Sequence, residues 1–174
     1  MHNVCLFLFL VILSTLCLHA QMPPSKTKEV AAKMTLLPIQ AGEWTGVGVQ
    51  QFGPNRYEVD QYEKITPMLD GTVLLIEGIG KDKGTIRHHA VATLSYDPAT
   101  QKYLFRSFKD GYVVDAETEL KADGSFVWSM QNARGTTRYI VRMVNGVWLE
   151  TGEFTTDGGK TWTAFLDMKL QKKQ

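Results

Sequence analysis

The chain has 174 residues and a formal net charge of +1 at pH 7, with 19 Lys and Arg against 18 Asp and Glu. Basic and acidic residues alternate along it, so no basic stripe suited to nucleic acid is found and no nucleic-acid partner is expected. Removal of a leader would leave about 150 residues, the size of one domain that buries its own core.

Residues 1–20 are predicted to be a signal peptide. The apolar run from Leu6 to Leu13 has the length of a signal-peptide core and is shorter than the roughly 20 residues of a membrane-spanning helix. Ala20 supplies a small residue for cleavage before Gln21. We therefore expect an exported protein, periplasmic or secreted, with no membrane span after cleavage. A lipid anchor on Cys17 and an uncleaved N-terminal anchor are the alternatives.

Both cysteines, Cys5 and Cys17, lie in the predicted leader. The mature chain would therefore have no disulfide, no thiolate metal ligand and no cysteine nucleophile. Export without disulfides fits a bacterial periplasm better than a small disulfide-bonded secreted domain. No H-E-x-x-H motif is present either, and no metal site is predicted.

Residues 21–35 are predicted to form an N-terminal segment that is partly helical. The run from Ser25 to Met34 is compatible with a helix that Ser25 caps and that Pro38 ends. Three residues of this run would face inward: Val30, Ala31 and Met34.

Residues 36–172 are predicted to form one β-barrel domain. This part shows no sustained helical period, and short β-rich runs alternate with turn residues instead. Asp-Gly pairs at residues 110–111 and 123–124 favour tight hairpins. Ten strands are predicted, at residues 43–52, 56–66, 72–80, 85–96, 102–109, 112–121, 125–131, 136–144, 147–155 and 161–170.

Nearly all connections between these strands are short, which makes neighbouring strands antiparallel. Ten strands would form an unwieldy open sheet, and closure into a barrel removes its two edges. In the last strand an apolar set that would face inward alternates with polar neighbours: Trp162, Ala164, Leu166, Met168 and Leu170. We therefore predict an all-β fold, a single antiparallel up-and-down barrel of about ten strands with a short N-terminal helix.

The first predicted strand carries Gly42, Trp44, Gly46 and Gly48 on one face, because these residues lie two apart. Glycine weakens a strand unless a bend or a close backbone approach needs it, and small barrels need strongly coiled strands. Trp44 would plug one end of the barrel. The G-x-W pattern resembles the start of lipocalin and fatty-acid-binding-protein barrels. The longer G-x-W-x-G-x-G pattern resembles the nitrobindins, ten-stranded barrels that bind haem.

Three longer motifs resemble an uncharacterised bacterial family of exported lipocalin-like proteins, domain-of-unknown-function family 1579. The first is D-G-T-x-L-L-x-x-G at residues 70–78. The second is A-x-x-S-Y-D-P-x-T-x-K-Y-x-F-x-S-F at residues 92–108. The third is W-x-E-x-G-E-x-x-x-D-G-G-K-T-W at residues 148–162. The resemblance implies a lipocalin-like barrel and export, and it implies no particular activity.

The nitrobindin resemblance implies that a late histidine holds haem iron, but this chain has no histidine after His89. Met143, Met168 and Tyr139 are the other candidate axial ligands, although a lone interior methionine is usually a core residue. We therefore expect no cofactor, with haem as the alternative.

The candidate ligand contacts are the two mature histidines and the charges in the middle of strands. His88 and His89 are neighbours and would point to opposite faces of their strand, so they cannot share one metal ion there. The cavity candidates are His88, His89, Glu77, Arg106, Arg138 and Arg142, and further mid-strand charges are Glu117, Glu150 and Glu153. For each of them a surface or rim position is the alternative. Stacking of Arg138 or Arg142 on Trp44, as in lipocalin-type barrels, would be structural.

Residues 155–162 match the T-x-D-x-G-x-T-W pattern of the sialidase Asp-box. In this turn Asp157 would cap the backbone, Gly159 would take a positive φ and Trp162 would pack beneath. The motif lies away from the catalytic site in sialidases, so it is interpreted as a structural turn.

The predicted function is binding of a small apolar or amphipathic ligand in the barrel cavity. This prediction of ligand binding depends mostly on analogy with proteins of similar fold, and a fold alone does not establish a function. An isomerase- or hydrolase-like enzyme that uses His88 or His89 is the second hypothesis, and haem binding is the third. The sequence has no phosphate-binding loop and no G-x-S-x-G motif.

Overall fold

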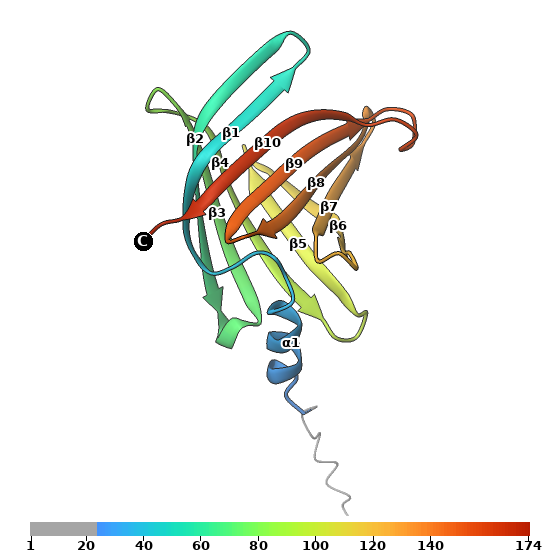
Figure 1. Cartoon of the computed structure of the whole chain (residues 1–174). Coiled ribbons are helices and arrows are strands. Elements are labelled where there is room, and N and C mark those ends of the chain that lie inside the picture. Colours follow the sequence, from blue (N-terminus) through green and yellow to red (C-terminus); the bar gives the residue numbers. More distant parts are fainter. Residues whose placement is uncertain (1–23) are drawn as a thin grey trace, which may run out of the picture.

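The computed structural model describes residues 24–174, and the predicted signal peptide lies outside them. These residues form a closed barrel of ten antiparallel strands, preceded by one short helix, α1 (Thr27–Met34), at one end of the barrel (Figure 1). The strands follow one another in chain order around the barrel, and the last strand pairs with the first. The predicted fold class is confirmed. Within residues 24–174 no helix has the length and apolar character that crossing a membrane requires.

The observed strands differ from the predicted ones by no more than two residues at either end. A single 3-10 turn, η1 (Leu69–Gly71), connects the second and third strands. The strands are β1 (Gly42–Phe52), β2 (Asn55–Met68), β3 (Val73–Asp82), β4 (Thr85–Asp97), β5 (Lys102–Lys109), β6 (Tyr112–Leu120), β7 (Phe126–Asn132), β8 (Gly135–Val144), β9 (Val147–Thr155) and β10 (Thr163–Lys172).

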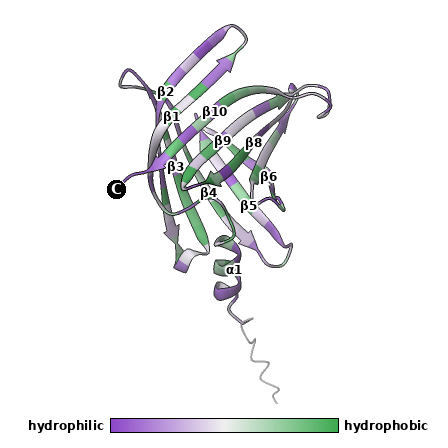
Figure 2. Ribbon diagram, viewed as in Figure 1, coloured by the Kyte–Doolittle hydropathy of each residue, from purple (hydrophilic) through white to green (hydrophobic). Residues whose placement is uncertain are grey.

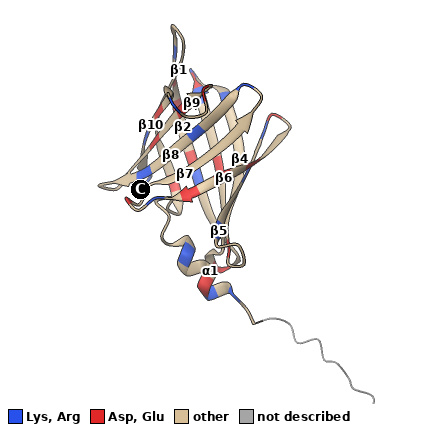
Figure 3. Ribbon diagram, turned by 90° about the vertical axis from the view of Figure 1, so that its right-hand side faces the viewer, with Lys and Arg blue, Asp and Glu red and all other residues tan. Residues whose placement is uncertain are grey.

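Side chains alternate between the lumen and the outer face along the strands, as the pleat of a strand requires. In Figure 2 hydrophobic and hydrophilic residues alternate along several of them. Figure 3 shows acidic and basic residues spread over the barrel wall and not gathered into one basic face. The most deeply buried side chains are Trp44, Phe126, Leu94, Leu170 and Val141.

Trp44 closes the α1 end of the lumen, as predicted. Its exposed fraction is 1%, and its indole N–H donates a hydrogen bond of 3.0 Å to the Gln40 carbonyl. The ring also meets Trp148 edge to face at a centroid distance of 5.8 Å, a favourable arrangement for two aromatic rings.

Helix α1 packs against this end through Val30 and Met34, which are buried, while Ala31 is half-buried. The Tyr103 hydroxyl donates a hydrogen bond of 2.8 Å to the Lys33 carbonyl and so ties β5 to the helix. Close contacts of this kind hold a short helix that would be marginal by itself.

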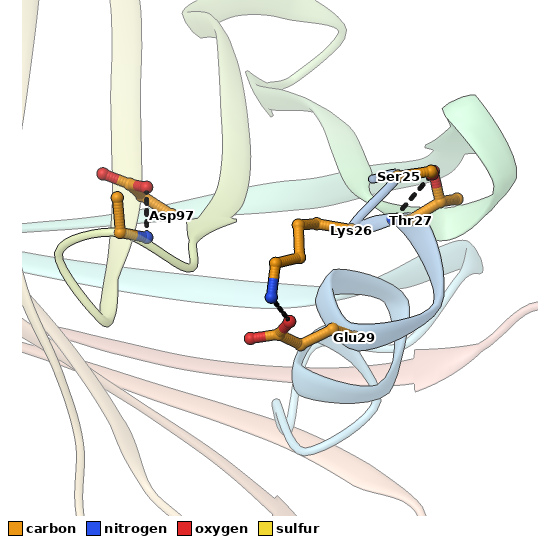
Figure 4. A network of polar contacts seen from close by, with 6 residues as sticks. Ser25, Lys26, Thr27, Glu29 and Asp97 are labelled. Atoms are coloured by element: carbon orange, nitrogen blue, oxygen red, sulfur yellow. Dashed lines mark hydrogen bonds and ion pairs between the residues drawn. The ribbon is translucent and has the colours of Figure 1, made fainter. Parts of the chain in front are cut away.

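The start of α1 differs from the prediction that Ser25 is its cap. The capping position is Lys26, which lacks a side-chain oxygen for this role. The Ser25 hydroxyl instead accepts a hydrogen bond of 3.3 Å from the Thr27 N–H and bonds the Thr27 hydroxyl, and Lys26 pairs with Glu29 (Figure 4). Figure 4 also shows Asp97, whose carboxylate holds the β4–β5 turn beside the helix.

The prediction that Trp162 and Ala164 face the lumen is wrong, because β10 contains a β-bulge between Ala164 and Leu166. The bulge adds one residue opposite β9 and thereby shifts the alternation. Phe165 joins Leu166 inside, and Ala164 is exposed. Gly152 makes room for the bulge, since a Cβ there would lie 2.7 Å from Phe165 Cζ.

The turn before β10 has the predicted Asp-box geometry. The Asp157 carboxylate accepts hydrogen bonds from the N–H groups of Lys160 and Thr161 and from the hydroxyls of Thr155 and Thr161, at 2.6 to 3.0 Å. These bonds hold the pKa of Asp157 well below its usual range. Gly159 has a φ of 90°, and the Trp162 indole N–H donates to its carbonyl at 3.1 Å.

The glycines of β1 have different roles. A Cβ at Gly46 would overlap the Lys169 carbonyl oxygen and lie 3.0 Å from Leu170 Cα, so Gly46 permits the close pairing of β1 with β10. A Cβ at Gly48 would meet only a side-chain atom, the Cγ2 methyl group of Val59, at 3.3 Å. Gly42 has a φ of 128°, a conformation that L-residues rarely adopt.

Gly46→Ala is therefore expected to lower the free energy of unfolding by more than about 2 kcal/mol, because the backbone of β10 must move away. Gly48→Ala, the matched control on the same face, is expected to cost less than about 1 kcal/mol. Urea unfolding of the two mature variants beside the parent measures both values. Equal effects would show that the β1–β10 pairing has room for a methyl group.

Candidate functional site

A cavity of about 530 Å³ occupies the lumen. It extends from Ile39, just after α1, to Phe52, Lys109 and Tyr112 at the hairpin end of the barrel, and all ten strands contribute to its lining. Pockets for small molecules usually measure about 300–1,000 Å³. The barrel is therefore not filled by its own side chains.

One side of the cavity is a continuous wall of aromatic rings. Phe105 stacks on Trp128 at a centroid distance of 4.7 Å, and Trp128 stacks on Tyr139 at 4.0 Å with an interplanar angle of 10°. Tyr139 meets Phe165 edge to face at 5.7 Å, and Phe165 stacks with Phe52 at 5.8 Å. These rings come from five strands, β5, β7, β8, β10 and β1, so the wall belongs to the rigid frame of the barrel.

The cavity also contains three buried polar side chains, Gln61 and Glu63 of β2 and Glu150 of β9, with exposed fractions of 8%, 8% and 9%. The Gln61 amide donates a hydrogen bond of 2.8 Å to a Glu63 carboxylate oxygen. Gly78 lies opposite Glu63 and Gly80 opposite Gln61 in the β2–β3 register. A Cβ at Gly78 would lie 2.6 Å from a Glu63 oxygen, so the absent side chain makes space for the carboxyl group.

Burial shifts the protonation of both carboxyl groups. It raises the pKa of Glu63 to about 8, with a further contribution from the charge of Glu150 and an opposing one from the Gln61 hydrogen bond. Burial likewise raises the pKa of Glu150 to about 7. The indole N–H groups of Trp148 and Trp128 have the opposite, smaller effect, because they favour the charged carboxylate. Both carboxyl groups therefore hold their protons to a higher pH than an exposed carboxyl group does.

Two neighbours of Glu150 complete this polar region. Burial and the charge of Glu150 raise the pKa of Tyr139 to about 12, so its phenol stays protonated. The indole N–H of Trp148 is buried and has no hydrogen-bond partner of normal geometry, although it lies close enough to Glu150 to favour the charged carboxylate. A buried donor without a partner is rare in proteins and calls for an explanation.

Of the six predicted cavity candidates, the structure places His88 in the cavity lining. It is half-buried, and its burial, followed by the charge of Lys109, lowers its pKa. His89 and Glu77 lie on the outer face instead, where their side chains contact each other at 3.0 Å. Arg106 is also outside, bound through two hydrogen bonds to Asp115 at 2.6 and 2.8 Å.

Arg138 and Arg142 line a second concavity, of about 610 Å³, on the outer face of β7 and β8. Arg138 binds Glu153 at 2.7 Å and stacks over the Trp162 ring at 3.7 Å. The predicted stacking of an arginine on Trp44 is therefore corrected to stacking on Trp162. The charge of Arg138 already has its partners, so this concavity offers less to a ligand than the lumen.

The inward position was one of two alternatives for Glu150, and the structure places it in the cavity. Glu63 was not among the predicted site residues. The signal for Glu63 is the alternation Val59, Gln61, Glu63, Ile65 in β2, which puts two polar residues on the apolar register. The pair Gly78 and Gly80 on the next strand adds to that signal, because only a recess accommodates such side chains at the wall.

Residues 24–174 contain no group of three or more His, Cys, Asp or Glu side chains placed to hold a metal ion. Tyr139 and Met168, two of the axial ligands considered for haem, line the cavity. The Tyr139 ring lies flat on Trp128, so one of its faces is already covered.

The raised pKa of Glu63 predicts a pH-dependent stability. The folded state binds a proton more tightly than the unfolded chain, so the free energy of unfolding falls as pH rises from about 5 to about 9. Glu63→Gln removes this group and is expected to raise stability near pH 9 relative to the parent by roughly 2–4 kcal/mol, with little effect near pH 5. Urea unfolding across this pH range measures the difference.

Glu58→Gln is the matched control, because Glu58 is on the same strand and exposed. Its pH profile is expected to follow that of the parent protein. A Glu63→Gln profile parallel to the parent profile would contradict a buried carboxyl group with a raised pKa.

Comparison with curated proteins finds no match. Among solved structures, the barrel is similar to the S-type phycobiliprotein lyase CPES from Guillardia theta, with a TM-score of 0.58 and 12% identity over 86% of this chain and 96% of that chain. At this identity the likeness shows a shared fold. A family model described as a protein of unknown function (DUF1579) matches residues 29–172, which include most of α1 and all ten strands. The chain therefore belongs to the DUF1579 family, in agreement with its sequence motifs.

Proposed function

We propose that this protein binds one small amphipathic molecule in the lumen of its barrel. The flat apolar part of the ligand lies against the aromatic wall, and its polar part reaches the buried carboxyl groups of Glu63 and Glu150. The observation that carries the proposal is a cavity of about 530 Å³ that combines both surfaces.

The energetics of the lumen support this assignment. Covering apolar surface is worth roughly 25 cal/mol per Å², so a flat ligand gains from the aromatic rings that line the cavity. The buried carboxyl groups and the unpartnered Trp148 N–H act against folding unless something compensates them. A barrel that served only as a scaffold would be more stable with a filled apolar lumen, and such costly groups are typical of functional sites.

We further propose that the protein acts after export, in the periplasm or outside the cell. The apolar run in residues 1–20 and the small residue Ala20 support this step. Fractionation of the native host tests it: the mature form, beginning at Gln21, is expected outside the cytoplasm.

Proton-transfer catalysis in the same cavity is the second candidate function. Glu63 and Glu150 have pKa values raised to about 8 and about 7, which suits general acid–base chemistry near neutral pH. His88 lines the same cavity. The similar barrel of a phycobiliprotein lyase belongs to an enzyme, but a shared fold carries no activity to this chain.

Val114→Trp is expected to weaken the binding of phenylnaphthylamine, a neutral fluorescent probe of apolar cavities, by at least about tenfold, because the indole fills part of the lumen. Val114 lines the cavity, whereas its neighbour Val113 is on the outer face with an exposed fraction of 58%. Val113→Trp is thus the matched control and is expected to leave the affinity unchanged. Fluorescence titration of the mature proteins, after their unfolding midpoints have been compared, measures both affinities.

No fluorescence enhancement with the parent protein would contradict the proposed function. Equal losses in the two variants would place the probe outside the lumen and contradict it as well.

A further inference from the structure

We propose that the ligand of the lumen is a flat organic cation, held between the carboxylates of Glu63 and Glu150 and the aromatic rings of Trp128 and Tyr139. This inference rests on the proposed function, because it names the chemical class of the molecule that the same cavity binds.

Among the described residues, no basic side chain lines the deep part of the cavity. The basic side chains that line it are Arg87, His88 and Lys109, and they come from the ends of β4 and β5 next to the hairpin turns. Arg87 pairs with Asp82 at 3.4 Å, and Lys109 pairs with Asp110. Within the described lumen the two buried carboxyl groups are therefore left without a basic partner.

A buried carboxylate without a partner takes up a proton or a positive charge, because the isolated anion is costly in an apolar surrounding. The raised pKa values of Glu63 and Glu150 correspond to the first outcome. A bound cation supplies the second. Cation binding is then coupled to the release of protons, and both carboxyl groups face the ligand in their charged form.

The aromatic wall lies in the same cavity as these two acids. Glu150 of β9 is paired with Val141 of β8, two residues from Tyr139, and all three line the cavity. Tyr139 in turn stacks on Trp128 at 4.0 Å, so the carboxyl group and the stacked rings are neighbours on the cavity wall. The faces of indole and phenol rings attract cations, and aromatic cages bind quaternary ammonium groups in this way. The wall therefore offers flat surfaces on which an organic cation can lie.

The Trp148 indole is 3% exposed and lines the cavity, and its N–H has no hydrogen-bond partner. Its N–H lies toward Glu150 and favours the charged carboxylate. A ligand cation that draws Glu150 into its charged form gives this donor a stronger acceptor. The unpartnered donor and the unpaired acids are then satisfied together.

Three probes of one shape and different charge test the inference: N-methylquinolinium, methylnaphthalene and naphthoate. Isothermal titration of the mature protein near pH 8.5 is expected to show the permanent cation binding at least about tenfold more tightly than the neutral probe, and the anion binding more weakly than both. Because the charge of N-methylquinolinium does not titrate, its affinity is expected to rise from about pH 6 to about pH 9 as Glu63 and Glu150 lose their protons.

Other titratable groups also line the cavity and could contribute to the pH dependence of cation binding: Arg87, His88, Lys109, Asp110, Tyr112 and Tyr139. The pKa of His88 is lowered, mainly by burial, and that of Tyr139 is raised to about 12. Titrations in buffers of different ionisation enthalpy are expected to show proton release on binding of the cation. A His88→Ala variant that keeps the same profile assigns the pH dependence to the carboxyl groups, and one that abolishes it overturns that assignment.

Glu63→Gln and Glu150→Gln are each expected to abolish the preference for the cation while methylnaphthalene still binds, and the exposed Glu58→Gln is expected to keep it. Retention of phenylnaphthylamine binding shows that each variant has a folded lumen. Equal affinities for cation and neutral probe, or a preference that survives both Gln variants, would overturn the cation assignment and leave the proposed function standing. Failure of phenylnaphthylamine and of all three probes would overturn the proposed function itself.

Discussion

The pairing of β1 with β10 is the constraint on which the rest of the molecule depends. It turns an up-and-down sheet into a closed wall and removes both free edges. Closure also divides every strand into one face that is enclosed and one that is wet. Gly46 permits this contact, because the Lys169 carbonyl occupies the place of its missing side chain. The position of each polar residue along a strand then decides whether it becomes surface or site.

Enclosure explains why so few residues define the candidate site. Most charged side chains are on the outer face, where several form exposed pairs, such as Arg106 with Asp115, which contribute little to stability. Glu63 and Glu150 are exceptions, since they lie inside and lack basic partners. The barrel tolerates this cost because the remaining interior is extensively packed around Trp44, Leu94 and Leu170. The apolar core thus includes the α1 end, while the buried polar side chains lie in the lumen.

The fold was predictable from the sequence because it depends on signals that repeat. Turn residues and alternation recur in each hairpin, and an error at one strand leaves the others correct. The site depends on single events that carry no such redundancy. The bulge at Phe165 shifts the alternation of β10 and moves Trp162 to the outer face. Histidines and arginines were predicted as site residues because of their residue type, but the burial of a side chain depends on strand register. Register places His88 in the cavity and His89 on the outer face.

Gly78 and Gly80 show that a binding surface can be shaped by atoms that are missing. Their bare backbone faces Glu63 and Gln61 across the β2–β3 pair, and it lets both polar groups lie flat at the wall. At each position the recess is the space that the methyl group of an alanine would fill. A relative with alanine there would push its carboxyl group toward the axis of the barrel and narrow the cavity. Under the proposed function, members of the family would therefore differ in which molecules they accept without any change in the residues that touch the ligand.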